Sequence, residues 1–261
     1  MYLNDLEQLA TIMANNQFSL LVLPRNYGTN RVYSALPLKN TFPVAPNDKG
    51  IIGIDQIRLL QSLCKSKQSA RQYYVLFGAE NLTEAAENAF LKLLEEPSDN
   101  TAFLLVTEDL SKLIPTVQSR AQIFHVNKLS KTDSLRMINA LNDDLDNKTK
   151  QQIMFLASGL PDEIEKLSTD ADYLKKQAKL VETAKKLVAG TPDDILLIAY
   201  QLKDKRDQAL KVLELAITVT NNIVSSKNHK LLARLTDLET TYNQLLANAN
   251  IRLAITANMI Q

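Results

Sequence analysis

The sequence predicts an α/β fold followed by an all-α region, and three observations lead to this prediction. Short runs of apolar residues, each the length of a strand, recur in the first half of the chain at 18–23, 72–77, 101–107 and 122–126. These runs do not alternate apolar with polar residues, which is typical of parallel strands covered by helices on both faces. Segments with helical periodicity lie between the runs, and only such segments follow residue 126.

Within the α/β part, the remaining elements have local signals of their own. A short strand is predicted at 41–46, where the prolines favour an edge position. A helix begins at Thr83, a natural N-cap, and ends at Pro97. Another helix would align four residues near helical spacing: Ile54, Ile57, Leu60 and Cys64.

Turn signals divide the all-α region into several helices. Gly190 ends one predicted helix, Thr191 caps the next, and Pro192 takes its first position. The segment 224–230 predicts another break. In the last helix, an apolar stripe at three- and four-residue spacing serves either a subunit interface or the bundle core: Leu245, Leu246, Ala249, Leu253 and Ala257.

Composition narrows the class of protein. The 261 residues carry 30 Lys and Arg against 29 Asp and Glu, so any contact with nucleic acid requires a local patch. Cys64 is the single cysteine, which excludes an intrachain disulfide, and no Cys/His cluster has the spacing of a zinc site. With no signal-peptide pattern and no long apolar stretch, we expect a cytoplasmic protein that holds no metal.

The places where a nucleotide site would lie lack its residues. The first predicted strand leads into 24–34, which has one glycine, Gly28, and no Gly-Lys-Ser/Thr, so an ordinary surface loop is favoured. At the end of the strand at 72–77, Phe77 and Gly78 stand where acidic residues would hold magnesium. Glu80 follows two residues later and is expected to face elsewhere.

Other catalytic arrangements are also unsupported. His125 lies within an apolar strand, where a core histidine is expected, and His229 is expected in a polar loop. Glu95 and Glu96 are adjacent on a helix, so they point in different directions and do not form an acid–base pair. We therefore expect a chain that is not an enzyme by itself and that needs no cofactor.

Four segments together resemble the AAA+ ATPase-like subunits of the bacterial DNA polymerase III clamp loader. They are IDQIRLLQSL (54–63), AENLTEAAENAFLKLLEEPSDNTAFLLVT (79–107), KLIPTVQSR (112–120) and LLANANIRLAI (245–255). The resemblance is strongest over about 40–127 and implies an AAA+-like parallel sheet, a small helical lid and an all-α collar. On this basis we expect a degenerate AAA+ domain at 1–127, a lid at 128–172 and an oligomerisation collar at 173–261.

The resemblance also indicates the type of subunit. Residues 24–30 align with the family's phosphate loop, which places Thr29 at its Lys and Asn30 at its Ser/Thr. With Phe77 and Gly78 in place of the paired acids, the chain is similar to the delta prime type, a stator that often lacks a working nucleotide site. The chain departs from the wider family in its short N-terminal part and in the absence of the zinc-binding cysteine module. Ala121 stands where the motif usually has Cys after Ser-Arg. Asp162 and Glu163 lie in the second sensor region, where the family commonly has an Arg.

One chemical group of the family remains. The resemblance implies that Arg120 is an arginine finger, which reaches the ATP of a neighbouring subunit and stabilises charge on the transferring phosphoryl group. Alternatively, Arg120 makes only local surface contacts. Ser119 shapes the turn, and Thr107, at the first sensor position, is expected to be a hydrogen-bonding residue at a strand end.

The expected function is that of a non-hydrolysing stator subunit in a heteropentamer. Its partners would be the motor (gamma/tau) and delta subunits, with contact to the sliding clamp and primed DNA through the assembled complex. Two alternatives remain open: an active DNA-dependent ATPase of the same family, and an AAA+-like bridging protein outside replication.

Overall fold

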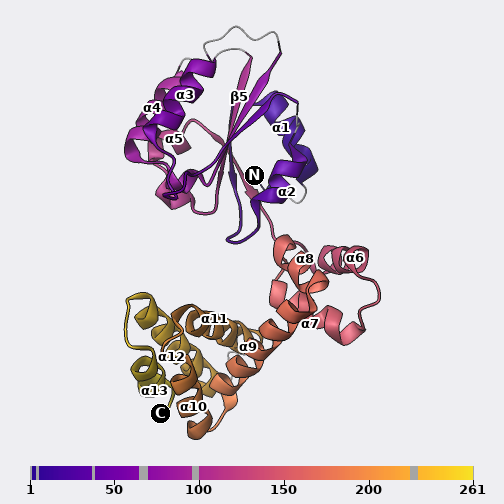
Figure 1. Ribbon diagram of the computed structural model, residues 1–261, viewed down its shortest axis with the longest axis vertical. Helices are drawn as coiled ribbons and strands as arrows, with labels where there is room; N and C mark the ends of the chain where they lie inside the picture. Colours follow the sequence, from indigo (N-terminus) through magenta and orange to yellow (C-terminus); the bar gives the residue numbers. More distant parts are fainter. Residues whose placement is uncertain are drawn as a thin grey trace. The chain divides into compact units, whose positions relative to one another are not determined.

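The computed structural model describes residues 2–3, 6–36, 39–64, 70–95, 100–223 and 229–260. The chain forms two compact units, Met1–Lys166 and Leu167–Gln261. The first unit contains the whole sheet, and the second is helical (Figure 1).

A six-stranded, wholly parallel sheet forms the centre of the first unit, in the order β1-β6-β2-β5-β4-β3. Continuous apolar sequence places β2, β4 and β5 in its interior, where β5 is buried at all seven positions. The prediction of a parallel sheet is confirmed, and β3 takes the expected edge. The strands are β1 (Tyr2–Leu3), β2 (Phe18–Val22), β3 (Thr41–Val44), β4 (Gln72–Phe77), β5 (Thr101–Thr107) and β6 (Gln122–Val126).

Helices cover both faces of this sheet (Figure 1). One face packs on η1 (Leu6–Gln8), α1 (Leu9–Asn15) and α2 (Thr29–Ala35) through a cluster that includes Leu9, Met13 and Val32. The opposite face packs on α3 (Ile54–Cys64), α4 (Glu84–Glu95) and α5 (Pro115–Gln118), with the short turns η2 (Ala79–Asn81) and η3 (Leu110–Lys112) at the strand ends.

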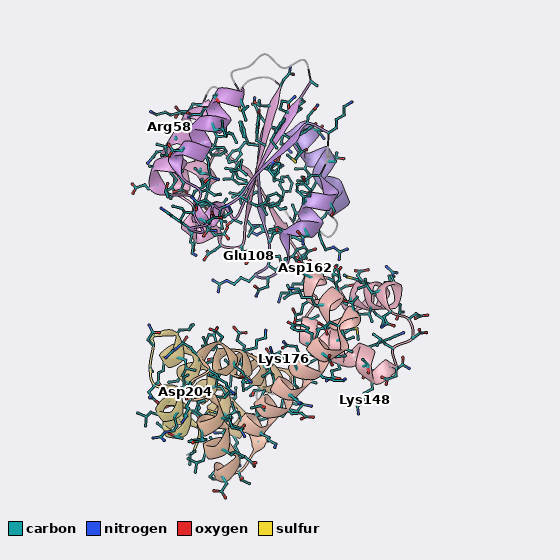
Figure 2. The ribbon with its side chains drawn as sticks, in the orientation of Figure 1. Arg58, Glu108, Lys148, Asp162, Lys176 and Asp204 are labelled. Atoms are coloured by element: carbon teal, nitrogen blue, oxygen red, sulfur yellow. The ribbon has the colours of Figure 1, made fainter. Side chains whose placement is uncertain are left out.

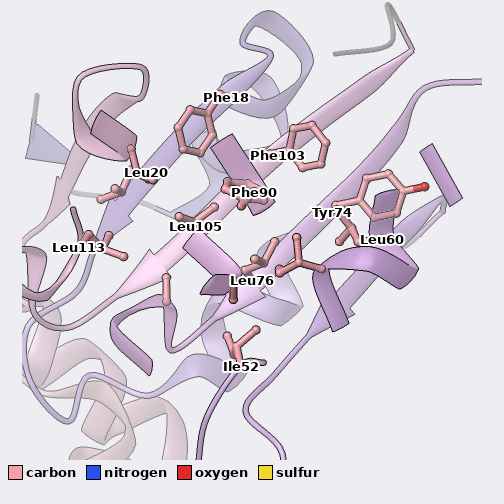
Figure 3. Close-up of a cluster of buried hydrophobic side chains, with 14 residues drawn as sticks. Phe18, Leu20, Ile52, Leu60, Tyr74, Leu76, Phe90, Phe103, Leu105 and Leu113 are labelled. Carbon is pink, nitrogen blue, oxygen red and sulfur yellow. The ribbon is translucent and has the colours of Figure 1, made fainter. Parts of the chain in front are cut away.

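The core under α3, α4 and α5 is built around aromatic rings. Phe90 of α4 meets Phe18 and Phe103 edge-to-face, with ring centroids 5.8 and 5.4 Å apart (Figure 3). Tyr74 stacks on Phe103 at 5.7 Å. Such contacts add to simple area burial and fix the position of α4 on the sheet. Thr83 caps α4 as expected, accepting a hydrogen bond from the Ala86 N–H (3.2 Å).

One sequence expectation for these elements needs correction, one strand was not predicted, and two residues lie outside the described ranges. The segment 24–34 is not simply a surface loop, because α2 begins at Thr29 and Tyr27 is buried. Strand β1 was not predicted, since two residues carry no periodicity. Pro97, expected to end α4, lies outside the described residues, as does Glu96.

Three helices complete the first unit: α6 (Lys131–Leu141), α7 (Asn147–Ala157) and α8 (Pro161–Thr169), the last of which extends past its boundary. Side chains cap α6 and α7, because Ser130 accepts from the Asp133 N–H and Asp146 from the Thr149 N–H. Gly159, at φ +78°, lies against the chain leaving β6, since an added β-carbon would come 2.6 Å from the Leu129 carbonyl oxygen. The Leu129 N–H also donates to the Gly159 carbonyl oxygen (2.9 Å).

The second unit contains five helices among its described residues: α9 (Ala171–Ala189), α10 (Pro192–Leu202), α11 (Arg206–Ile223), α12 (His229–Leu246) and α13 (Ile251–Met259). Thr191 and Asp194 form a reciprocal capping box at α10, as the Gly-Thr-Pro signal predicted. The predicted break at 224–230 lies mostly outside the described residues.

The predicted stripe in a single last helix is wrong. The chain turns between α12 and α13, with Asn248 at φ +64° and Asn250 capping α13. Arg206 reinforces the turn by donating to the carbonyl oxygens of Leu245 and Ala249. As a result the predicted stripe is split: Leu245 is buried, whereas 60% of Leu253 is exposed.

Candidate functional site: a closed phosphate loop and an exposed arginine

The loop between β2 and α2 occupies the position of the family's phosphate loop. Tyr27 is 4% exposed and packs in the cluster under α1 and α2, so the protein itself fills the space beneath the loop. Thr29 and Asn30 open α2 with exposed side chains. Neither side chain can supply the positive charge that a triphosphate requires.

Two carboxylates of the chain's own sequence close this loop. The Asn26 N–H, at a residue with φ +59°, donates to Glu108 Oε1 (3.1 Å). Gly28, at φ +93°, lies so close to Asp162 that a β-carbon on it would come 1.9 Å from Asp162 Oδ2. Figure 2 labels Glu108 and Asp162 at this end of the sheet. A phosphate group entering the loop would therefore meet negative charge from two directions.

Asp162 reaches the loop from the first turn of α8. Burial raises the pKa of this carboxyl, and Glu165 adds to the rise, while Lys166 and Arg31 oppose it. Arg31 also ties α2 to α6, since its Nη1 lies 3.1 Å from Met137 Sδ. Leu160, two residues before Asp162, packs against the cluster under α1 and α2. The neighbouring Glu163 also lies in the first turn of α8.

The positions that would hold magnesium are apolar or lack a side chain. Phe77 is buried and packs near Tyr33, with ring centroids 6.3 Å apart, and Gly78 adopts a left-handed conformation that starts η2. Glu80 was expected to face elsewhere, but its Oε2 accepts from Thr107 Oγ1 at the end of β5 (2.8 Å). The prediction that Thr107 is a hydrogen-bonding residue at a strand end is confirmed.

Arg120 directly follows α5 and Ser119, and its side chain is 42% exposed. Its Nη1 donates to the Thr116 carbonyl oxygen (3.1 Å), and its Nη2 lies 3.4 Å from Glu95 Oε1. Ser119 Oγ donates to the same carbonyl oxygen (3.2 Å), which agrees with a role in shaping the turn. The local contacts allowed for Arg120 are thus present, and the guanidinium still reaches solvent.

The other candidate residues form no second site. His125 was expected in the core but lies half-buried in β6. His229 was expected in a polar loop but begins α12. Across the described ranges, no three His, Cys, Asp or Glu side chains group as metal ligands, and no helix is long and apolar enough to span a membrane. Sequence reasoning missed Glu108 and Glu87: Glu108 follows the segment 79–107 that carries the resemblance, and Glu87 lies within it without a signal that sets it apart.

Comparison with known proteins points to one family. The family model described as DNA polymerase III, delta subunit, matches residues 31–130. Two curated delta prime subunits match as well: that of Haemophilus influenzae is 42% identical over 77 residues, and that of Pseudomonas aeruginosa 30% over 139. The Haemophilus alignment covers 29% of this chain and 24% of the relative, and the Pseudomonas alignment covers 52% and 42%. The chain is therefore aligned with less than half of either relative's length.

Solved structures share the fold. A DNA polymerase III gamma subunit-related protein from Thermotoga maritima is 18% identical, with a TM-score of 0.57 over 98% of this chain and 97% of that chain. The RuvB Holliday junction branch migration motor of the same organism is 15% identical, with a TM-score of 0.51 over 93% and 85%. The AAA+-like fold is therefore confirmed. The family model and the two relatives support a clamp loader subunit of the delta prime type.

Proposed function

We propose that this chain is a non-hydrolysing, stator-like subunit of the clamp loader, and that it supplies Arg120 to the ATP site of a neighbouring subunit. Its partners would be the motor (gamma/tau) and delta subunits. The assembled complex would load the sliding clamp on primed DNA. This proposal extends the family assignment, since the matching relatives are aligned over only part of their length.

The closed phosphate loop is the observation that carries the proposal. A triphosphate needs a Lys, a metal ligand and free backbone N–H groups. Here Thr29 and Phe77 replace the first two, and the Asn26 N–H is already bonded to Glu108. The Asp162 carboxylate against Gly28 would repel the phosphates. An ATPase motor is therefore disfavoured, and a subunit that acts on another subunit's nucleotide is favoured.

The position of Arg120 supports action across an interface. It lies at the amino-terminal start of β6, whereas the closed loop follows the carboxyl end of β2. Because β2 and β6 are parallel neighbours, these are opposite ends of the sheet. Arg120 thus cannot serve the chain's own loop, and an exposed planar guanidinium suits the phosphate oxygens of a neighbour.

The helical region offers an assembly surface. On α10, three large residues at helical spacing are exposed by about half of their area: Leu196 (49%), Leu197 (57%) and Tyr200 (58%). An apolar stripe on the outside of a helix is typical of a protein interface. We propose that residues 173–261 form the oligomerisation collar, with 1–127 as the degenerate AAA+ domain and 128–172 as the lid.

Reconstitution tests the proposal. The full chain is mixed with motor and delta subunits from its own organism, and the mass of the native complex is measured. Clamp loading on primed DNA is then compared with and without the chain. Co-assembly together with loss of loading on omission is expected. Full loading without the chain would contradict the proposal, and failure to recover the motor subunit would favour a bridging role outside replication.

A further inference from the structure

The short turn that carries Arg120 is attached to α4 at two points. α5 is a single turn, from Pro115 to Gln118, so it has little stability of its own. The position of the guanidinium therefore depends on what holds this turn to the rest of the domain. Both attachments are carboxylates of α4, those of Glu87 and Glu95.

The first attachment is made by Glu87. Its side chain is 4% exposed, and its Oε1 accepts from the N–H of Ile114, the residue that caps α5 (3.0 Å). Burial raises the pKa of the Glu87 carboxyl, while the hydrogen bond from Ile114 opposes the rise. A buried carboxylate is costly, and a nonpolar side chain at this position of α4 would pack without that cost. The hydrogen bond from the Ile114 N–H offsets part of this cost and holds the start of α5 to α4.

The second attachment is made by Glu95, the last residue of α4. Its Oε1 lies 3.4 Å from Arg120 Nη2, while Nη1 donates to the Thr116 carbonyl oxygen. The two contacts hold both terminal nitrogens of the fork. A cavity of about 390 Å³ opens beside this pair, with a lining that includes Gln17, Phe18 and Phe103.

We propose that Glu87 and Glu95 are positioning residues for Arg120: Glu87 fixes the start of its turn, and Glu95 aims its guanidinium. This inference rests on the proposed function. An arginine that is already ordered loses less conformational freedom when it meets a phosphate than one that is free. Removal of either carboxylate should therefore lower the effectiveness of the finger without removing the finger itself.

The test uses steady-state ATP turnover of the complex reconstituted with motor and delta subunits, after native mass measurement confirms assembly. Arg120→Ala sets the scale of the loss. Glu95→Ala should give part of that loss, because an exposed ion pair shifts an equilibrium by up to about fivefold. Glu87→Leu should give most of it, whereas Glu87→Gln, which keeps the oxygen that accepts from Ile114, should stay close to wild type.

Double variants separate positioning from general damage. When Arg120 is already Ala, adding Glu95→Ala or Glu87→Leu should lower turnover no further, since both act through Arg120. The control is Asp55→Ala, which removes an exposed carboxylate paired with Arg58 of α3, and it should leave turnover unchanged. If Glu87→Leu does not fold, Glu95→Ala still tests the role of Glu95. Glu87→Gln then tests that of Glu87, because a loss as large as that of Arg120→Ala in a variant that keeps the accepting oxygen would contradict the role of the Ile114 hydrogen bond.

The possible failures can be told apart. Unchanged turnover in Arg120→Ala would refute the proposed function itself. A loss in Arg120→Ala with normal turnover in both Glu95→Ala and Glu87→Leu would overturn only the positioning roles. Losses that add fully to that of Arg120→Ala would also overturn them.

Discussion

Substitution of Gly28 by alanine tests whether the Asp162 carboxylate closes the loop between β2 and α2. Gly28 has φ +93° and ψ +129°, a conformation that residues with a β-carbon rarely adopt. The new β-carbon would also overlap the Asp162 carboxylate, with Oδ2, Cγ and Oδ1 at 1.9, 2.1 and 2.4 Å. Gly28→Ala therefore combines backbone strain with the displacement of a side chain from another helix.

Each contribution has an expected size. Backbone strain of this kind costs about 1–3 kcal/mol. Moving Asp162 out of its rotamer adds about 0.5–1.5 kcal/mol. The free energy of unfolding of the first unit should fall by about 1.5–4.5 kcal/mol in total. In a chain that also carries Asp162→Ala, the second contribution disappears, and the cost of Gly28→Ala should fall by about 0.5–1.5 kcal/mol.

Two other glycines of the same domain provide matched controls. Gly50 has φ +73° with no atom within 4 Å of an added β-carbon, so Gly50→Ala should show backbone strain alone. Gly53 has open space and no such backbone conformation, so Gly53→Ala should be neutral or stabilising by up to about 1 kcal/mol. Neither control should respond to Asp162→Ala.

Native-state hydrogen exchange is the appropriate assay, because two units make a single melting curve ambiguous. The slowest backbone amides of the buried strand β5 report the unfolding of the first unit in every variant. If Gly28→Ala costs no more than Gly50→Ala, or if its cost is the same with and without Asp162, the carboxylate does not close the loop.

Three further outcomes are expected. Titration of the isolated chain with magnesium-ATP should release no saturable heat, and micromolar binding would contradict the closed loop. Leu197→Lys on the exposed face of α10 should weaken co-purification with the motor subunit while leaving helical content unchanged; unaltered recovery would remove this face from the interface. Burial raises the pKa of Glu87 in the folded state, so the first unit should lose stability as pH rises from about 4 through that pKa. Glu87→Gln should flatten this part of the profile of unfolding free energy against pH. An unchanged profile would refute the burial argument.

The fold could largely be predicted because its strongest signals are local. Continuous apolar runs gave the central strands, and Thr83 and Thr191 marked helix starts through caps that the structure contains. The turn before α13 was missed although Asn248 and Asn250 were visible, because helical spacing across the turn was given more weight than turn chemistry.

The candidate site could be predicted only in part. The missing groups at Thr29 and Phe77 were evident, since a motif names the positions it needs. Asn26 contacts Glu108, which lies 82 positions away in the sequence, and Gly28 contacts Asp162, which lies more than a hundred positions away. No sequence periodicity predicts contacts between such distant residues. Asp162 was expected only near the second sensor, and its place against Gly28 follows from the packing of α8.

We propose that this chain contributes an arginine, and no nucleotide site, to an ATP-driven complex. The most direct test is the ATP turnover of the reconstituted complex containing Arg120→Ala, measured with clamp and primed DNA and normalised to the amount of intact complex. We expect normal assembly with a partial loss of turnover, because one site loses its finger while the others keep theirs. We also expect little recovery in Arg120→Lys, which lacks the planar fork. Unchanged turnover in a correctly assembled complex would contradict it.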